Sequence, residues 1–371
     1  MDRLRIGVLL VRGGKFVVGV LQETIITIYS GNFCAGSLLG LRFVGIESNS
    51  IFRRSLKMIH DSAASKTIFI VHPGKANYPE IAAYASYFGD LGFHVMSGSK
   101  RDYAKIPKDV RKRTVVWCIM GFYPTKFDAR LVIHDYRSLS VGRCASLKDR
   151  VKRHLQPTPA LRIFQTAEME KMMGFSGNGK SVILPMGVPD WIFSMNEDAI
   201  ADDVPSATFC YIGEISRERG FDSFLDGFCR FRRSDETLIL VGDAEKCIVE
   251  RFEGAPGVTF TGRLPQRNAL AVVRKSRFAV STIPSVRPYN VQAPTKLLEY
   301  AALGKPIVCN DSRSNIDVIN KFGINCLITG PTIFDRLDRE RLIVSLPNDP
   351  GKLHMLRWNE IIRRADIESM F

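Results

Sequence analysis

The sequence lacks the features that define several classes of protein. Its eight cysteines show no C-x-x-C spacing, and no internal repeat or low-complexity tract is visible. No apolar run reaches the roughly 18 residues of a membrane span. A disulfide-stapled mini-protein, a collagen or coiled-coil fibre and a membrane-spanning helix are therefore excluded. Several cysteines lie inside apolar runs, as in VVWCIM and PIVCN, so we expect buried thiols in a reducing, cytoplasmic compartment.

The composition is that of a globular chain with two domains. Its 371 residues are 45% hydrophobic and 24% charged, and a typical domain holds about 100 to 200 residues. The acidic stretch 197–203 is the best candidate for a linker. We predict an N-terminal domain at 1–195, a C-terminal domain at 196–352, and a helix at 353–371 that packs back on the first domain.

Short apolar runs rich in β-branched residues alternate with helix-length amphipathic segments. This alternation is typical of parallel sheets with helices on both faces, so we predict an α/β fold of two Rossmann-like, doubly wound domains. Residues 67–96 already form an opening β-α-β unit, which leaves 4–11 as either a true first strand or an addition to the domain. The other predicted strands are 114–120, 129–133, 161–164, 181–184, 209–212, 237–241, 258–260, 278–282, 306–309 and 325–328.

The net charge of +14 lies entirely in the front half. Residues 1–195 hold 28 Lys and Arg against 14 Asp and Glu, whereas residues 196–371 hold 24 of each kind. The basic residues are densest at 101–153. This asymmetry favours a polyanionic partner for the first domain, either an anionic membrane surface or a nucleic acid. A solvated basic face without a partner is an equally good interpretation.

One passage, STIPSVRPYNVQAPTKLLEYAALGKPIVCN at 281–310, predicts a strand end, a loop with three prolines, a helix and a buried strand. Thr295 is a suitable N-cap for this helix. Unpaired N–H groups and the dipole at such a helix start attract anions. Lys296 is a cation in the first turn, where the helix dipole disfavours positive charge, so its position favours a bound phosphate that neutralises this charge. Glu299, one turn later, can accept hydrogen bonds from both hydroxyls of a ribose. An exposed Lys and Glu without a ligand is the alternative.

A second loop, YIGEISRERG at 211–220, leaves the first strand of the same domain. Gly213 lets the backbone approach a ligand, and Arg217 and Arg219, near Ser216, can bind a pyrophosphate in bidentate fashion. Taken together with the helix of Lys296, this loop predicts a diphosphate site.

The motifs in these loops resemble those of retaining glycosyltransferases with the GT-B fold, glycosyltransferase family 4 (glycosyl transferases group 1). YIGEISRERGFDSFLDGF is similar to the family's strand, glycine and basic loop, and PTKLLEYAALGKPIV to its donor-site helix. GVTFTGRLPQRNALAVVRKSRFAVSTIPS resembles its V-x-F-x-G segment and the strand that follows. SVILPMGVPDWIF resembles the strand that closes the N-terminal domain, with Met186 where Asn is usual. The resemblance covers about residues 131–327 and is faint before residue 67.

The resemblance implies a nucleotide-sugar site in the second domain. Glu299 would bind the ribose, while Lys296 and Arg219 would contact the diphosphate as catalytic groups. The further substrate-binding positions are Gly213, Ser216 and Arg217 in the first loop, the backbone at Thr295 and Leu297, and Arg263 and Leu264 beside the base.

Two departures from the family pattern affect this site. The family's paired-glutamate motif has its first Glu at the position of Val291, where this chain has no carboxylate. Glu214 stands where many members have a basic residue, so Arg217 or Arg219 must supply the positive charge. Both changes put the contacts to the donor sugar in doubt.

In the first domain, His134 and Asp135 follow the strand ARLVI, at the end where a doubly wound sheet presents functional groups. The resemblance implies that His134 faces the donor sugar as a third catalytic residue. A structural histidine is the alternative. The residues predicted on the acceptor side are Gly74, Lys75, Gly121 and Arg137.

We therefore predict an enzyme, a hexosyltransferase-like retaining glycosyltransferase. It would move a sugar from a UDP- or GDP-sugar to a saccharide or lipid-linked acceptor of a surface polysaccharide or lipopolysaccharide. No metal-ligand spacing is evident, so neither a metal nor another cofactor is expected. The basic first domain would meet anionic headgroups at the inner face of the cytoplasmic membrane.

Two alternatives stay open. A GT-B epimerase or phosphorylase would keep the nucleotide or phosphate site with another acceptor. A non-catalytic basic protein would bind nucleic acid or membrane. No nucleic-acid module is recognised, so no nucleic-acid partner is expected.

Overall fold

The computed structural model divides the chain into two compact units, Met1–Ser65 and Lys66–Phe371. The described residues are 6–11, 15–22, 25–32, 66–74, 78–119, 121–142, 144–175 and 179–371. In the first unit, β1 (Ile6–Val11) pairs antiparallel with β2 (Lys15–Gln22), and β2 pairs antiparallel with β3 (Ile25–Asn32). The strand predicted at 4–11 is therefore an addition, because it lies in this three-stranded sheet and not in a parallel one.

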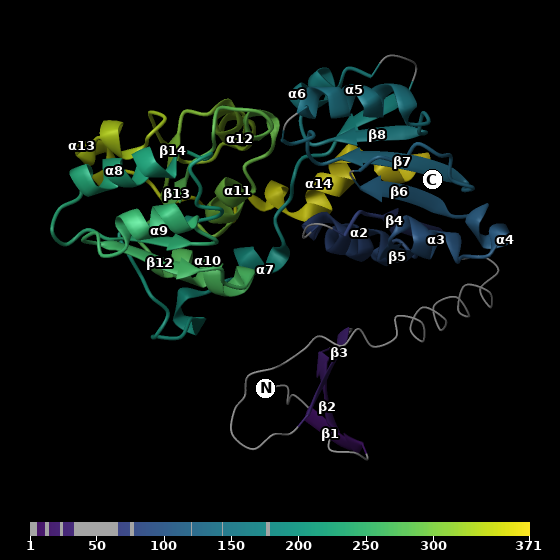
Figure 1. The fold of residues 1–371 in the computed structure, drawn as a ribbon, viewed down its shortest axis with the longest axis horizontal. Helices are drawn as coiled ribbons and strands as arrows, with labels where there is room; N and C mark the ends of the chain where they lie inside the picture. Colours follow the sequence, from purple (N-terminus) through teal and green to yellow (C-terminus); the bar gives the residue numbers. More distant parts are fainter. Residues whose placement is uncertain are drawn as a thin grey trace. The chain divides into compact units, whose positions relative to one another are not determined.

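The second unit contains two six-stranded parallel sheets (Figure 1). The first has the order β5-β4-β6-β7-β8-β9, and every neighbouring pair is parallel. β4 and β6 are buried at every position, as expected for strands covered on both faces. The strands are β4 (Thr67–Val71), β5 (His94–Gly98), β6 (Val115–Ile119), β7 (Leu131–Tyr136), β8 (Leu161–Phe164) and β9 (Lys180–Ile183).

The second sheet has the order β12-β11-β10-β13-β14-β15 and is also fully parallel. Its strands agree with the predicted ones to within two residues. They are β10 (Phe209–Ile212), β11 (Leu238–Val241), β12 (Val258–Gly262), β13 (Phe278–Ser281), β14 (Ile307–Asn310) and β15 (Leu327–Thr329). The direction of winding reverses between β10 and β13, which makes this pair the topological switch point.

Helices cover both faces of the second sheet. Cys210 of β10 packs in a core cluster with Leu270 and Leu297, whereas its neighbour Phe209 packs in a different cluster with Phe224. Since successive strand residues point to opposite faces, α10 and α11 lie on one face and α8 on the other. The helices of this domain are α8 (Phe221–Phe231), α9 (Lys246–Phe252), α10 (Gln266–Lys275), α11 (Thr295–Ala302), α12 (Arg313–Phe322) and α13 (Arg339–Ile343).

The sequence of α8 shows why these helices form where they do. Gly220 adopts a positive φ of 79° immediately before the helix. Phe221, Phe224, Leu225 and Phe228 follow at the spacing of one helical face and are buried. The corresponding helices of the first sheet are α2 (Pro79–Asp90), α3 (Lys100–Ala104), α4 (Lys108–Arg111), α5 (Ala145–Leu155), α6 (Ala167–Met173) and, at the crossover, α7 (Asp190–Phe193).

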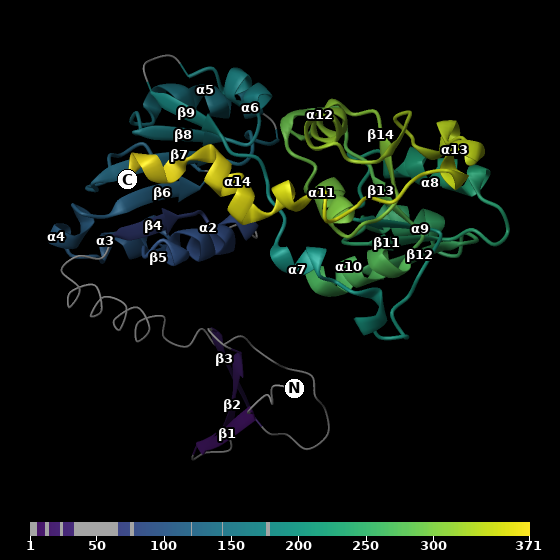
Figure 2. The same cartoon turned by 180° about the vertical axis from the view of Figure 1, so that it is seen from behind.

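The end of the chain returns to the first sheet's helices. α14 (Trp358–Ala365) lies beside α2 (Figure 2). The Phe371 ring lies 5.3 Å from Phe88, measured between centroids, and Tyr87 donates a hydrogen bond of 2.8 Å to Glu368. Within the described residues, no helix combines the length and apolar character needed to cross a bilayer.

Candidate functional site

Two adjoining cavities lie at the switch point of the second sheet. The smaller, of about 220 Å³, is lined by residues that follow β10 and β13. The larger, of about 860 Å³, shares Gly213, Thr295 and Lys296 with it. Ligands of open α/β sheets bind where the strand order reverses. The predicted residues that line one or both cavities are Gly213, Arg219, Arg263, Leu264, Thr295, Lys296 and Glu299.

Gly213 lines both cavities. Its φ is +152°, and a Cβ atom built there would lie 2.5 Å from the hydroxyl oxygen of Tyr211. Any side chain would therefore clash with Tyr211 while forcing a strained backbone. Glycine at this position keeps the backbone open to a ligand.

The amino end of α11 faces both cavities. The helix has Pro294 as its N-cap, because the carbonyl of Pro294 accepts a 3.3 Å hydrogen bond from the N–H of Leu298. The prediction that Thr295 is the N-cap is therefore wrong, and Thr295 is the first helical residue. The N–H groups of Thr295, Lys296 and Leu297 precede the first intrahelical donor, so none has a partner within the helix. The Leu297 side chain is buried, which leaves only its backbone for a ligand.

Lys296 and Glu299 form an ion pair inside the site. The Lys296 ammonium lies 3.0 Å from one Glu299 carboxylate oxygen, and the Gln266 amide donates a 2.6 Å hydrogen bond to the other. Glu299 is only 7% exposed, yet it lines the larger cavity. Glu299 is therefore buried and not exposed, whereas the Lys296 side chain is 35% exposed, and binding of a ligand by this pair stays a prediction.

Arg219 supplies the positive charge of the glycine loop. Its Nε lies 3.2 Å from a carboxylate oxygen of Glu214, and its guanidinium lies 4.4 Å from the centroid of the Tyr289 ring. Arg219, Glu214 and Tyr289 all line the smaller cavity. The acid at position 214 therefore forms an ion pair with Arg219, the arginine that supplies the positive charge of this loop.

Two predicted contacts of this loop point elsewhere. Arg217 is exposed and forms an ion pair of 3.2 Å with Asp222, and it lines neither cavity. Ser216 is 3% exposed and also lies outside both. Its carbonyl accepts hydrogen bonds from the N–H groups of Arg219 and Phe221, at 3.1 and 3.2 Å. Direct substrate contacts by Arg217 and the Ser216 hydroxyl are therefore not supported, and Ser216 shapes the turn that presents Arg219.

Arg263 and Leu264 line the larger cavity, as predicted for residues beside the base. Arg263 is highly exposed and lies 3.7 Å from Asp243, so it is loosely held. Pro79 and Trp358 contribute to the same cavity, which therefore lies between the two sheets' domains.

His134 lies inside β7 and not beyond its end, so the predicted strand boundary is wrong. The side chain is 4% exposed and lines neither cavity. Burial, together with the neighbouring Arg162, lowers the pKa of His134 to about 4. The structure therefore does not bring His134 together with Lys296 and Arg219.

Arg137 was expected on the acceptor side, but it is 4% exposed. Its Nε lies 2.7 Å from Asp135, whose carboxylate also accepts hydrogen bonds from Tyr84 and Trp117, at 2.8 and 3.0 Å. Arg137 also donates to the carbonyl of Leu184 at 2.8 Å. The acceptor-side prediction for Arg137 is therefore wrong, because its charge is satisfied within the first domain.

Gly74 and Gly121 follow the neighbouring strands β4 and β6, where the first sheet reverses its winding. Both have positive φ, +68° and +112°. Neither lines the two cavities of the second sheet. Lys75 lies outside the described residues. The acceptor side stays a prediction at Gly74, Lys75 and Gly121.

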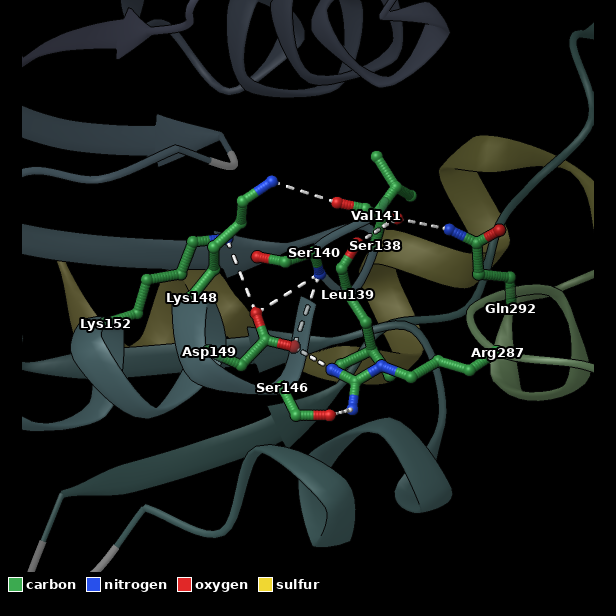
Figure 3. A network of polar contacts seen from close by, with 10 residues as sticks. All are labelled: Ser138, Leu139, Ser140, Val141, Ser146, Lys148, Asp149, Lys152, Arg287 and Gln292. Atoms are coloured by element: carbon green, nitrogen blue, oxygen red, sulfur yellow. Dashed lines mark hydrogen bonds and ion pairs between the residues drawn. The ribbon is translucent and has the colours of Figure 1, made fainter. Parts of the chain in front are cut away.

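The loop between β13 and α11 is fastened to the first domain. Arg287 donates to Ser146 at 3.1 Å and forms an ion pair with Asp149, while Gln292 donates to Ser138 (Figure 3). Val291, where the family pattern has a carboxylate, is 6% exposed and packs in a cluster with residues of β7, β8 and α6. The position is therefore a hydrophobic contact between domains in this chain.

The part of the chain that the structure describes contains no group of three or more His, Cys, Asp or Glu side chains arranged to hold a metal ion. The charged residues that line the two cavities are the basic Arg219, Arg263 and Lys296 and the acidic Glu214, Asp243 and Glu299. The absence of a metal and of further cofactors stays a prediction.

Part of the chain matches the model of a known family. Residues 206–334 match the model of the family described as glycosyl transferases group 1. This segment spans the whole second sheet, from β10 to β15, and confirms the predicted resemblance there. No curated protein matches the chain.

Solved structures match most of the chain. HepE from Anabaena, in complex with UDP and glucose, is 14% identical, with coverage of 83% of this chain and 97% of that chain and a TM-score of 0.56. AviGT4, a glycosyltransferase involved in avilamycin A biosynthesis, is 13% identical, with coverage of 80% and 95% and a TM-score of 0.54. A UDP-forming α,α-trehalose-phosphate synthase from Burkholderia xenovorans, in complex with glucose-6-phosphate, is 14% identical, with coverage of 97% and 90% and a TM-score of 0.51.

These likenesses, together with the two parallel sheets, confirm the predicted α/β fold as GT-B. The family match and the cavity at the switch point support a glycosyltransferase.

The residues of the site that were not predicted include three polar side chains. Gln266 binds the Glu299 carboxylate, Tyr289 lies against Arg219, and Gln292 lines the smaller cavity. Gln266 opens a helix directly after the recognised GRLP segment, and that position could have indicated it. Tyr289 and Gln292 lie in an irregular loop, where sequence spacing carries no information about neighbours.

Proposed function

We propose that the protein is a glycosyltransferase whose second domain binds a nucleoside diphosphate sugar, with UDP- and GDP-sugars as the favoured donors. The observation that carries this proposal is the amino end of α11, where backbone N–H groups and Lys296 face the smaller cavity together with Arg219. Anionic phosphates are stabilised at such helix ends. The family match over residues 206–334 supports the same assignment.

The hydrogen-bonding capacity of the site is sufficient for a diphosphate. Lys296 uses one of its three N–H donors on Glu299. Arg219 uses its Nε on Glu214 and also contacts the Tyr211 hydroxyl, and a guanidinium has five N–H donors, so donors are left for phosphate oxygens. Each Glu299 oxygen accepts one bond, from Lys296 or Gln266, and can accept another from a ribose hydroxyl.

Positive charge at the diphosphate would promote the reaction. Cleavage of the anomeric C–O bond leaves oxocarbenium-like charge on the sugar and negative charge on the departing diphosphate. Lys296, Arg219 and the α11 dipole stabilise that developing negative charge. We propose transfer with retention of configuration. The departing phosphate oxygen can then take the acceptor proton on the same face of the sugar, so no protein nucleophile is required at Val291.

The acceptor is proposed to be a saccharide or a lipid-linked saccharide of a surface polysaccharide or lipopolysaccharide. The excess of 28 Lys and Arg over 14 Asp and Glu in residues 1–195 favours a negatively charged surface beside the first domain. We propose a cytoplasmic protein that acts at the inner face of the membrane.

A thermal-shift panel of UDP-, GDP-, ADP- and CMP-sugars tests the donor site. A donor at about 100 times its Kd should add about 2.7 kcal/mol to the free energy of unfolding. Glu299→Ala should lose this gain. The matched control is Glu250→Ala, which removes an exposed acid whose partner is Lys246 on α9 and should keep it. A wild-type chain that responds to none of these compounds would contradict the proposal.

A further inference from the structure

Helix α5 carries an apolar stripe that the described residues of the second unit leave exposed. Leu147, Val151 and Leu155 are 58%, 37% and 58% exposed, and Val141, just before the helix, is 58% exposed. The three helical residues are spaced by four, so they form a line about 12 Å long on one face. Apolar side chains in a core-facing stripe are normally buried.

Basic residues border this stripe on both sides. At about 100° per residue, Lys148 and Lys152 lie along one edge, and Arg150 and His154 lie along the other. Lys148, Arg150 and His154 are exposed. An apolar stripe between two rows of cations is the pattern of a helix that lies in the interface of an anionic bilayer.

The opposite face of α5 is attached to the protein. Asp149, the helix's one acid, is 3% exposed and binds Arg287 and the N–H of Ser140 (Figure 3). The charge that would repel an anionic surface is therefore turned inward and neutralised. Arg287 belongs to the loop that lines the smaller cavity. The stripe and the donor loop thus lie on opposite sides of one helix, about 10 Å apart.

We infer that α5 is a docking surface for anionic lipid, with Leu147, Val151 and Leu155 inserted among the acyl chains and Lys148 and Arg150 at the headgroups. This inference rests on the membrane-bound acceptor of the proposed function and names the surface that reaches it. Insertion of such a helix reaches about 5–10 Å below the headgroups. Docking through α5 holds the donor loop next to the plane in which a lipid-linked acceptor lies.

Vesicle co-sedimentation of the full chain tests the inference. Vesicles of phosphatidylcholine and phosphatidylglycerol should bind the protein, vesicles of phosphatidylcholine alone should bind it much less, and added salt should weaken binding. Leu147→Gln with Leu155→Gln should weaken binding about tenfold, because glutamine keeps helix propensity and removes the apolar surface. Lys148→Gln with Arg150→Gln should weaken it roughly thirtyfold at low salt.

The matched control is Ile343→Gln with Leu346→Gln, which removes two side chains that are each 69% exposed in the second domain. This variant should bind vesicles like the wild type. Unchanged vesicle binding by both α5 variants would overturn the inference, and so would loss of binding in the control alone. Conversion of an oligomer to a monomer by the α5 leucine variant, without loss of vesicle binding, would assign the stripe to a second copy of the chain and also overturn it.

Nucleotide-sugar binding, measured on the same variants without vesicles, separates this inference from the proposed function. All three variants should keep their thermal shift, because none of the substituted residues lines the two cavities. Vesicle binding without any response to nucleotide sugars would leave the docking surface in place and refute the donor site instead.

Discussion

Replacing Lys296 by alanine removes the one lysine that faces both cavities at the switch point. A hydrogen bond with a charged partner contributes about 1.5–3 kcal/mol, so the Kd for the donor should rise roughly 10- to 100-fold. The diphosphate gains charge as it departs, so kcat should fall by about another 100-fold. The fold should persist, because Glu299 keeps its 2.6 Å hydrogen bond from Gln266.

Titration calorimetry with the donor and initial-rate measurements would separate the two effects. Lys246→Ala is the matched control, since Lys246 forms a similar pair, 3.3 Å from Glu250, on the exposed side of α9. An unchanged donor Kd in Lys296→Ala, or an equal loss in both variants, would refute the assignment of the α11 end as the diphosphate site.

Three further predictions follow from the surroundings of the site. Arg219→Ala should weaken donor binding at least tenfold, whereas Arg217→Ala should leave the Kd unchanged, as calorimetry would show. Arg287→Ala should lower the free energy of unfolding by about 2 kcal/mol, because the buried carboxylate of Asp149 then has one cation fewer beside it. A double-mutant cycle with Asp149→Asn should show coupling between the two changes in melting temperature. Additive changes would contradict the contact. The folded chain holds the pKa of His134 at about 4, against 6.5 in the unfolded chain. The contribution of His134 to stability should therefore be constant above pH 6.5 and fall by about 3 kcal/mol toward pH 4. His134→Gln should remove this part of the pH dependence, and an identical fall in stability between pH 6.5 and pH 4 in the variant would contradict it.

The sequence was most informative where hydrophobic pattern and turn chemistry agree. The strands of the second sheet were predicted to within two residues, because each is a short, buried, β-branched run between helix-length segments. The helix of Lys296 and Glu299 was located by its position after a strand and by the family resemblance. Confirmation of the glycosyl transferase segment at 206–334 follows from the same motifs.

The errors share a physical cause, because sequence alone does not show which polar side chains are satisfied by distant partners. The polar residues after position 133 led us to predict that the strand ends there. In the structure β7 continues to Tyr136, because Asp135 and Arg137 form a buried ion pair. Arg217 and Arg219 are similar in sequence but pair with different acids. Arg217 pairs with Asp222 outside the cavities, whereas Arg219 pairs with Glu214 beside the smaller cavity.

The pairing of 6–11 with 15–22 could not be predicted either. Both segments are apolar, and such runs fit a parallel or an antiparallel partner equally well. The hydrophobic role of Val291 depends on packing against α6 and β8, far away in the sequence.

A crystal structure with the nucleoside diphosphate sugar that gives the largest thermal shift tests the central claim most directly. The account predicts a phosphate oxygen within hydrogen-bond distance of the N–H groups of Lys296 or Leu297, with the ribose hydroxyls on Glu299. Density for the nucleotide at any other place, with both cavities at the end of α11 free of it, would contradict the account.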